Sequence, residues 1–176
     1  MDTKLTSLAP FFQDPFYQFS LRELARMLHS NHTTVRQHLR LLVKEGLLTA
    51  KKEGVYTFYQ LIFSKKLQNL KLFYNLERLR QSGLVEDLEK AFDFPVIILF
   101  GSFASATDDK TSDIDIALIS DVSRDFSLGK YEQLLHRPIN LRKFSGKLWA
   151  SVIKENPSLV NSMCNGVVLS GELEVV

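Results

Sequence analysis

The chain has 176 residues, of which 45% are hydrophobic and 24% are charged, and its formal net charge is +2. This length suits one large domain or two small ones, and the ordinary apolar content excludes a long disordered chain. The apolar runs are too short to cross a bilayer, and the N-terminus lacks a secretory signal pattern, so no membrane partner is expected. The single cysteine, Cys164, excludes an internal disulfide and favours a reducing, cytoplasmic location.

Charge is distributed unevenly along the chain. Residues 1–63 carry eight Lys or Arg against five Asp or Glu, whereas residues 64–176 carry 14 against 15. The basic surplus therefore lies in the N-terminal part, where it indicates an anionic partner.

The first predicted elements are two helices followed by a hairpin. Ser20-Leu21-Arg22-Glu23 is a capping box, in which the Ser20 and Glu23 side chains each bond the other residue's backbone, and it predicts a helix start. A second helix is expected over about residues 32–45, with Gly46 ending it. Residues 47–50 and 55–62 are the predicted strands of a hairpin, and residues 51–54 are its basic turn.

This order of elements resembles the winged helix-turn-helix family over residues 20–61. The resemblance implies that the second helix enters the major groove of double-stranded DNA and that the hairpin contacts the phosphate backbone. The implied base contacts come from the second helix and the implied phosphate contacts from the hairpin: His32, Thr33, Thr34, Arg36, Gln37 and Arg40, then Lys51 and Lys52. The alternative is that these residues solvate an exposed face and that this domain mediates protein contacts.

A connecting helix is expected over residues 64–81, followed by a shorter one over residues 84–92. Apolar residues recur in the first of these at helical spacing, namely Leu67, Leu70, Phe73, Tyr74, Leu76 and Leu79. Two roles stay open for this helix: it packs two domains together, or it forms a homodimer contact.

Two acidic side chains follow a glycine–serine turn. The apolar strand predicted over residues 95–100 leads into Gly101-Ser102, and ten residues later Asp113-Ile114-Asp115 opens a second strand that extends to Ile119. Because strand side chains alternate between faces, both carboxylates project to one side. Paired carboxylates near a phosphate-holding turn are suited to bind Mg²⁺ together with a triphosphate.

The rest of the chain alternates helices and strands. A helix is expected over residues 126–136 with Tyr131, Leu134 and Leu135 facing inward, and a third strand over residues 138–142. Two further helices are expected over residues 145–155 and 157–165, and residues 167–169 end the regular structure.

From about Leu84 to the C-terminus, the Gly-Ser turn and the Asp-x-Asp strand are similar to the minimal nucleotidyltransferases of the DNA polymerase β superfamily. The resemblance implies that Gly101 and Ser102 hold the triphosphate of an NTP and that Asp113 and Asp115 bind Mg²⁺ or Mn²⁺. A third carboxylate normally completes this site on the next strand, but this chain has Asn140 there. A neutral amide is a weaker metal ligand and cannot accept a proton from an attacking hydroxyl.

The predicted fold class is therefore α+β with two domains. Residues 1–63 form the winged helix, residues 64–83 the connecting helix, and residues 84–176 the nucleotidyltransferase fold, a small mixed sheet flanked by helices. The predicted function is that of a DNA-binding regulator whose second domain binds NTP and metal, with weak or absent transfer. The alternative is an active enzyme that moves an NMP to a hydroxyl of a protein or nucleic acid, as in antitoxin-like nucleotidyltransferases that act on a partner protein.

Overall fold

The structure is a computed structural model and describes residues 3–173 of the chain. These residues divide after Lys71 into two compact units. The division falls inside helix α4 (Lys65–Ser82), so the domain boundaries expected at residues 63 and 84 stay a prediction.

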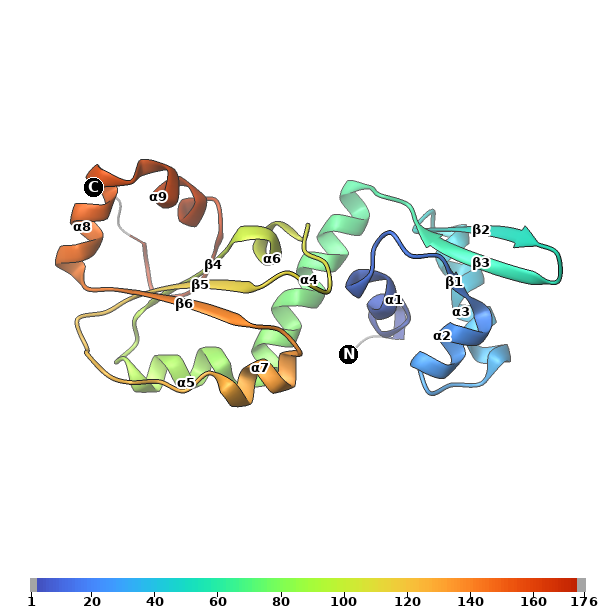
Figure 1. The fold of residues 1–176 in the computed structure, drawn as a ribbon, viewed down its shortest axis with the longest axis horizontal. Helices are drawn as coiled ribbons and strands as arrows, with labels where there is room; N and C mark the ends of the chain where they lie inside the picture. The colour runs from blue at the N-terminus through green and yellow to red at the C-terminus, as the bar shows by residue number, and fades with distance from the viewer. Residues whose placement is uncertain (1–2, 174–176) are drawn as a thin grey trace. The chain divides into compact units, whose positions relative to one another are not determined.

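Unit 1 combines helices with a small antiparallel sheet (Figure 1). Its helices are α1 (Thr3–Gln13), α2 (Leu21–Met27) and α3 (His32–Lys44), and its strands are β1 (Phe19–Ser20), β2 (Leu48–Glu53) and β3 (Tyr56–Leu61). The strand order is β1-β3-β2, and both pairings are antiparallel. Side chains from all three helices and from the hairpin are buried in its core, including Phe11, Leu24, Leu39 and Leu48.

The termini of α2 and α3 are fixed by local hydrogen bonds. Ser20 Oγ accepts a bond from the Glu23 amide, and Glu23 Oε2 accepts one from the Ser20 amide, which confirms the predicted capping box. Asn31 caps α3 by accepting a bond from the Thr34 amide, at 2.8 Å. After α3 the chain turns at Gly46, where φ is +71°, a conformation that favours glycine.

Two features of unit 1 differ from the predictions. Helix α1 has no counterpart among the predicted elements, since Pro10 lies inside it and an internal proline argues against a helix. The hairpin turn is at Gly54 and Val55, between the paired residues Glu53 and Tyr56, and not at residues 51–54. Lys51 and Lys52 consequently lie within β2, so the prediction of a basic hairpin tip is wrong.

Unit 2 contains the later part of α4 and all subsequent elements. These are α5 (Leu84–Ala91), β4 (Val96–Phe100), α6 (Gly101–Ser105), β5 (Ile114–Ile119), α7 (Gly129–Leu135), β6 (Ile139–Phe144), α8 (Gly146–Glu155), α9 (Pro157–Cys164) and β7 (Val167–Ser170). The sheet has the order β6-β5-β4-β7. Strand β4 is antiparallel to β5 and β7, whereas β5 and β6 are parallel, which confirms the predicted small mixed sheet.

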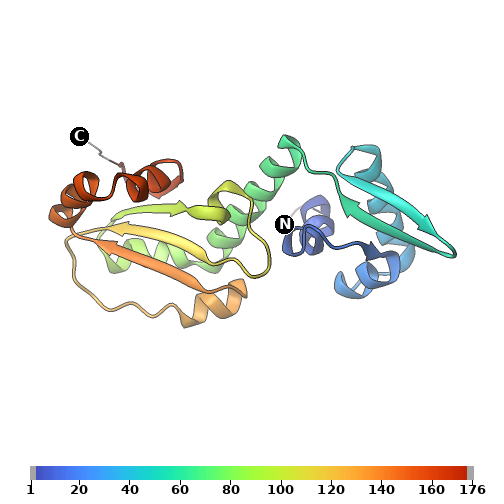
Figure 2. The ribbon, with the colours of Figure 1, turned by 45° about the horizontal axis from the view of Figure 1, so that its top comes forward.

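Helices cover both faces of this sheet (Figures 1 and 2). On one face, α5, α7 and the end of α4 pack on residues such as Leu99, Ile114 and Ile116. On the other face, Trp149 of α8 and Met163 of α9 pack on Ile98, Ala117 and Phe144. Strand alternation places Phe100, Asp115 and Asn140 on this second face, because each is an even number of residues from a strand position in its core.

One predicted helix is shorter than expected. Helix α7 begins at Gly129 rather than near residue 126, and Tyr131 and Leu135 are buried as predicted. Leu134 is 62% exposed, so its predicted inward orientation is wrong. Within residues 3–173, no helix has both the length and the apolar character needed to span a membrane.

Candidate functional site

The backbone at Gly101 approaches the side chain of Asp115 very closely. Strand β4 ends at Phe100, which pairs with Asp115 of β5, and the chain turns at Gly101 with φ of +72°. A Cβ atom at Gly101 would lie 2.5 Å from Asp115 Oδ2. Any larger residue would therefore displace this carboxylate and also strain the backbone. Ser102 follows at half-buried depth in α6.

The two aspartates differ in their surroundings. Ile114 and Ile116 are fully buried, so the residues between and before them face away from that core. Asp115 is half-buried within β5, whereas Asp113 is exposed and lies immediately before the strand begins.

Asn140 lies beside Asp115. Strands β5 and β6 are parallel with these two residues in register, and Asn140 Nδ2 donates a hydrogen bond to Asp115 Oδ1 at 3.0 Å. An ionised carboxylate only accepts hydrogen bonds, so this contact turns the amide NH₂ group toward it. The structure thus brings Asp115 and Asn140 together at paired strand positions, with Gly101 beside Asp115 just after the end of β4.

The donor set suits a metal that arrives with a nucleotide better than an isolated ion. In the part of the chain that the structure describes, no three His, Cys, Asp or Glu side chains gather closely enough to hold a metal. Mg²⁺ is usually held by one or two carboxylates together with phosphate oxygens. Asp113 and Asp115 supply that number of carboxylates, and the absence of a Cβ at Gly101 leaves the space that the Asp115 carboxylate occupies.

The loop before Asp113 is held by polar contacts, some within the loop and some with residues of other elements. Asp108 is 1% exposed and accepts a hydrogen bond from Asn75 Nδ2 at 2.9 Å. Arg137, also buried, places Nη2 3.6 Å from Asp108 Oδ2. Asp109 accepts bonds from the Thr111 hydroxyl and amide, which lower the pKa of the Asp109 carboxyl. The sequence alone had assigned no role to Asn75 or Arg137.

The predicted DNA-contacting residues of α3 form one exposed face. Val35, Leu39 and Leu42 are buried on the opposite side of the helix. Of the predicted contacts, Thr34 is half-buried, and the others on α3 are exposed: His32, Thr33, Arg36, Gln37 and Arg40. Lys51 and Lys52 are exposed on β2, and Lys51 forms an ion pair with Glu53 at 2.8 Å.

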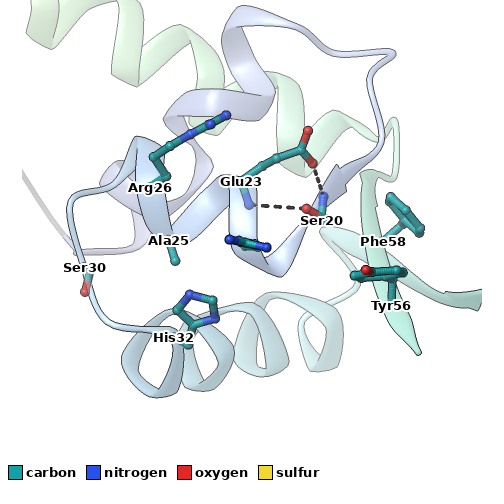
Figure 3. Close-up of a pocket in the computed structure, with 9 residues that line it drawn as sticks. Ser20, Glu23, Ala25, Arg26, Ser30, His32, Tyr56 and Phe58 are labelled. Carbon is teal, nitrogen blue, oxygen red and sulfur yellow. Dashed lines mark hydrogen bonds between the residues drawn. The ribbon is translucent and has the colours of Figure 1, made fainter.

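Two adjoining hollows of about 630 and 590 Å³ lie between α2, α3 and the hairpin. Figure 3 shows the first, with the Ser20–Glu23 bonds on one side, His32 at the start of α3, and Tyr56 and Phe58 from β3. Their cationic lining consists of Arg22, Arg26, Arg36 and Arg40. Arg22, Arg26 and Tyr56 were not among the predicted contacts, because the resemblance implied contacts only from the second helix and from two lysines of the hairpin.

A comparison with known families gives a match within unit 2. Residues 83–163 match the family model described as Polymerase beta, Nucleotidyltransferase. This match runs from the start of α5 almost to the end of α9 and includes Gly101, Asp115 and Asn140. No curated protein matches the chain. Residues 83–163 therefore form a nucleotidyltransferase-like domain.

Proposed function

We propose that this protein is a DNA-binding regulator whose nucleotidyltransferase-like domain binds an NTP with Mg²⁺ or Mn²⁺ and transfers the nucleotide weakly or not at all. The observation that carries the proposal is the hydrogen bond from Asn140 Nδ2 to Asp115 Oδ1. At the strand position where the family resemblance places a third carboxylate, this chain holds a neutral hydrogen-bond donor.

The substitution changes the chemistry of the site in two ways. Asn140 cannot accept a proton from an attacking hydroxyl, and the loss of a general base typically costs about 10²–10⁴ in rate. Its amide also bonds Asp115 directly, where a third carboxylate would repel it unless a cation lay between them. A bound divalent cation would neutralise charge on the phosphates. Gly101 and Ser102 would contact the triphosphate, and Asp113 and Asp115 would hold the ion.

In the same proposal, unit 1 is a winged helix that binds double-stranded DNA. The support is the exposed polar face of α3 and the arginine-lined hollows between α3 and the hairpin. Arg36 and Arg40 would approach bases and phosphates from α3, while Lys51 and Lys52 would contact phosphates from β2.

The alternative function is active transfer of an NMP to a hydroxyl of a protein or nucleic acid. The presence of both carboxylates that would hold the ion, Asp113 and Asp115, supports this alternative, because one or two carboxylates with phosphate oxygens can hold Mg²⁺. In this alternative, Asp113 and Asp115 suffice for transfer, and one acceptor class is a partner protein of the kind on which antitoxin-like nucleotidyltransferases act.

Transfer assays separate the two functions. The full-length protein is incubated with each α-phosphate-labelled NTP and Mg²⁺ or Mn²⁺, in parallel with Asp113→Ala and Asn140→Asp. We expect no stable labelling by the wild type and a gain of labelling by Asn140→Asp. Labelling by the wild type that Asp113→Ala abolishes would establish the alternative.

The DNA-binding part is tested by mobility shifts on genomic DNA fragments at several salt concentrations. We expect binding that weakens as salt rises, because phosphate contacts release counterions. An absent shift, or one that salt does not change, would remove DNA from the proposal and leave unit 1 as a protein-contact module.

A further inference from the structure

The backbone on both sides of Asp113 is tied to two consecutive residues before β6. The Ser112 carbonyl accepts a hydrogen bond from Arg137 Nη1 at 3.1 Å. The Ile114 amide donates one to the Pro138 carbonyl at 2.9 Å. Asp113 thus lies between two residues whose main chains are fixed by residues 137 and 138, although its own side chain is exposed.

Arg137 is held in place by a buried polar set. Its guanidinium contacts both the Ser112 carbonyl and the carboxylate of Asp108, and the Arg137 and Asp108 side chains are 4% and 2% exposed. Asn75 Nδ2 donates to Asp108 Oδ1 at 2.9 Å and also to the Phe103 carbonyl at 3.0 Å. These five residues come from four parts of the fold: α4, α6, the loop before β5 and the segment before β6.

Core stability alone does not account for this set. Burying a charged pair costs desolvation energy, and apolar residues of similar volume often serve the core as well or better. What the pair provides is a fixed orientation: a planar guanidinium can bond a carbonyl with one nitrogen and meet a carboxylate with another. The residue that gains from this orientation is the exposed carboxylate next to Ser112.

We infer that Arg137 is a positioning residue for the metal–nucleotide site, which fixes Asp113 relative to Asp115 through the Ser112 carbonyl, with Asp108 and Asn75 orienting its guanidinium. This inference rests on the proposed function, since it names how that same site is held. The segment that carries Arg137 continues into β6, so it places Asn140 beside Asp115 as well.

A positive charge at position 137 should not be sufficient to hold Asp113 in place. In Arg137→Lys the ammonium can still pair with Asp108, but a single nitrogen cannot reproduce both contacts of the guanidinium fork. Unit 2 should then stay folded while Asp113 loses its fixed position. If Arg137 served only the stability of unit 2, the position of Asp113 would be lost only when unit 2 was destabilised.

The test measures the affinity of the full-length protein for Mg–ATP by equilibrium dialysis. The four proteins compared are wild type, Arg137→Lys, Asp113→Asn and the double variant. Fluorescence of Trp149, the chain's one tryptophan, follows unfolding of unit 2. We expect Arg137→Lys to bind Mg–ATP about tenfold more weakly with an unchanged unfolding midpoint, and to cause no further loss when Asp113 is already Asn. The matched control is Arg80→Lys, the same change at an exposed arginine paired with Glu77, which should leave affinity unchanged.

Two results would overturn the inference while leaving the proposed function intact. In the first, Arg137→Lys binds Mg–ATP as tightly as the wild type. In the second, Arg137→Lys weakens Mg–ATP binding by the same factor whether residue 113 is Asp or Asn. A wild-type protein that binds no Mg–ATP would instead remove the proposed function itself, and with it this inference. The two failures are therefore distinguishable.

Discussion

The exposed face of α3 and the Gly101–Asp115–Asn140 site are both polar, but they are built differently. On α3 the polar side chains project from a helix whose packing depends on the apolar residues behind them. At the second site, the polar groups are fixed by a close backbone approach, a side-chain hydrogen bond and strand register. Substitutions on the exposed face of α3 should therefore leave the fold intact and change the salt dependence of binding. At the Gly101–Asp115–Asn140 site, by contrast, a single added methyl group should change ligand affinity.

Loss of the buried Arg137–Asp108 pair should destabilise the protein more than any other change considered. Arg137→Met leaves Asp108 without its cation, and breaking a buried ion pair typically costs about 3–5 kcal/mol. Chemical denaturation followed by Trp149 fluorescence measures the loss within unit 2. Arg80→Met is the matched control, because its exposed pair with Glu77 should contribute no more than about 1 kcal/mol. Equal losses in the two variants would show that the second site has no special internal support.

A methyl group at Gly101 tests whether the close approach matters. Gly101→Ala forces a residue with a Cβ into a left-handed conformation, which costs roughly 1–2 kcal/mol. The added methyl group also displaces the Asp115 carboxylate. We expect nucleotide affinity to fall at least about tenfold, as judged by equilibrium dialysis with Mg–ATP, since a preorganised charge is moved. In Gly129→Ala the new Cβ meets no atom within 4 Å, so nucleotide affinity should not change. Normal nucleotide binding by Gly101→Ala would contradict this account of the site.

Neutral substitutions of arginines on α3 test whether its exposed face contacts DNA. Each of Arg36→Gln and Arg40→Gln should reduce the slope of log affinity for DNA against log salt by about 1 if its guanidinium contacts a phosphate. Neither change should alter the unfolding of unit 1, because both side chains are exposed. Lys44→Gln is the control, since Lys44 lies on the same helix but does not line the arginine-rich hollows. A slope that is equally affected by all three changes would indicate a diffuse charge effect rather than a defined surface.

The smallest effect concerns the start of α2. Ser20→Ala should destabilise the helix by about 1 kcal/mol, measured by amide hydrogen exchange within α2. The amide and hydroxyl of Ser20 lower the pKa of the Glu23 carboxyl in the folded state. A lowered folded-state pKa stabilises the fold at pH values above the unfolded pKa, about 4.3, and this stabilisation is lost as pH falls through the folded pKa. The wild type should therefore lose protection in α2 on acidification below about pH 4, whereas Glu23→Gln should show no such pH dependence. An identical pH dependence in Glu23→Gln would show that another group is responsible.

Much of the local structure could be predicted because it is encoded by neighbouring residues. The capping box at Ser20, the strand beginning next to Asp113 and the glycine turn after α3 each depend on a few consecutive side chains. The mixed sheet was expected from the resemblance to nucleotidyltransferases, since alternating strands and helices alone would predict a parallel sheet. The hairpin turn was misplaced by two residues because Lys51 and Lys52 are polar enough to suit either a turn or an exposed strand.

The support of the site could not be predicted from local patterns. Asn75, Asp108 and Arg137 are widely separated in sequence, and nothing in their immediate neighbours distinguishes them from exposed polar residues. Their pairing depends on how α4, α6 and β6 pack in three dimensions. Helix α1 escaped prediction for the opposite reason, because one local signal, Pro10, conflicted with the packing that stabilises the helix.

The most direct test of the central claim measures bound and transferred label in one sample. The full-length protein is mixed with α-phosphate-labelled NTP and Mg²⁺, then divided between a native filter assay and a denaturing gel. We expect label to be retained by the native protein and little or none to stay attached after denaturation, because Asn140 supplies no proton acceptor beside Asp115. Strong labelling that survives denaturation in the wild type but not in Asp113→Ala would contradict this expectation.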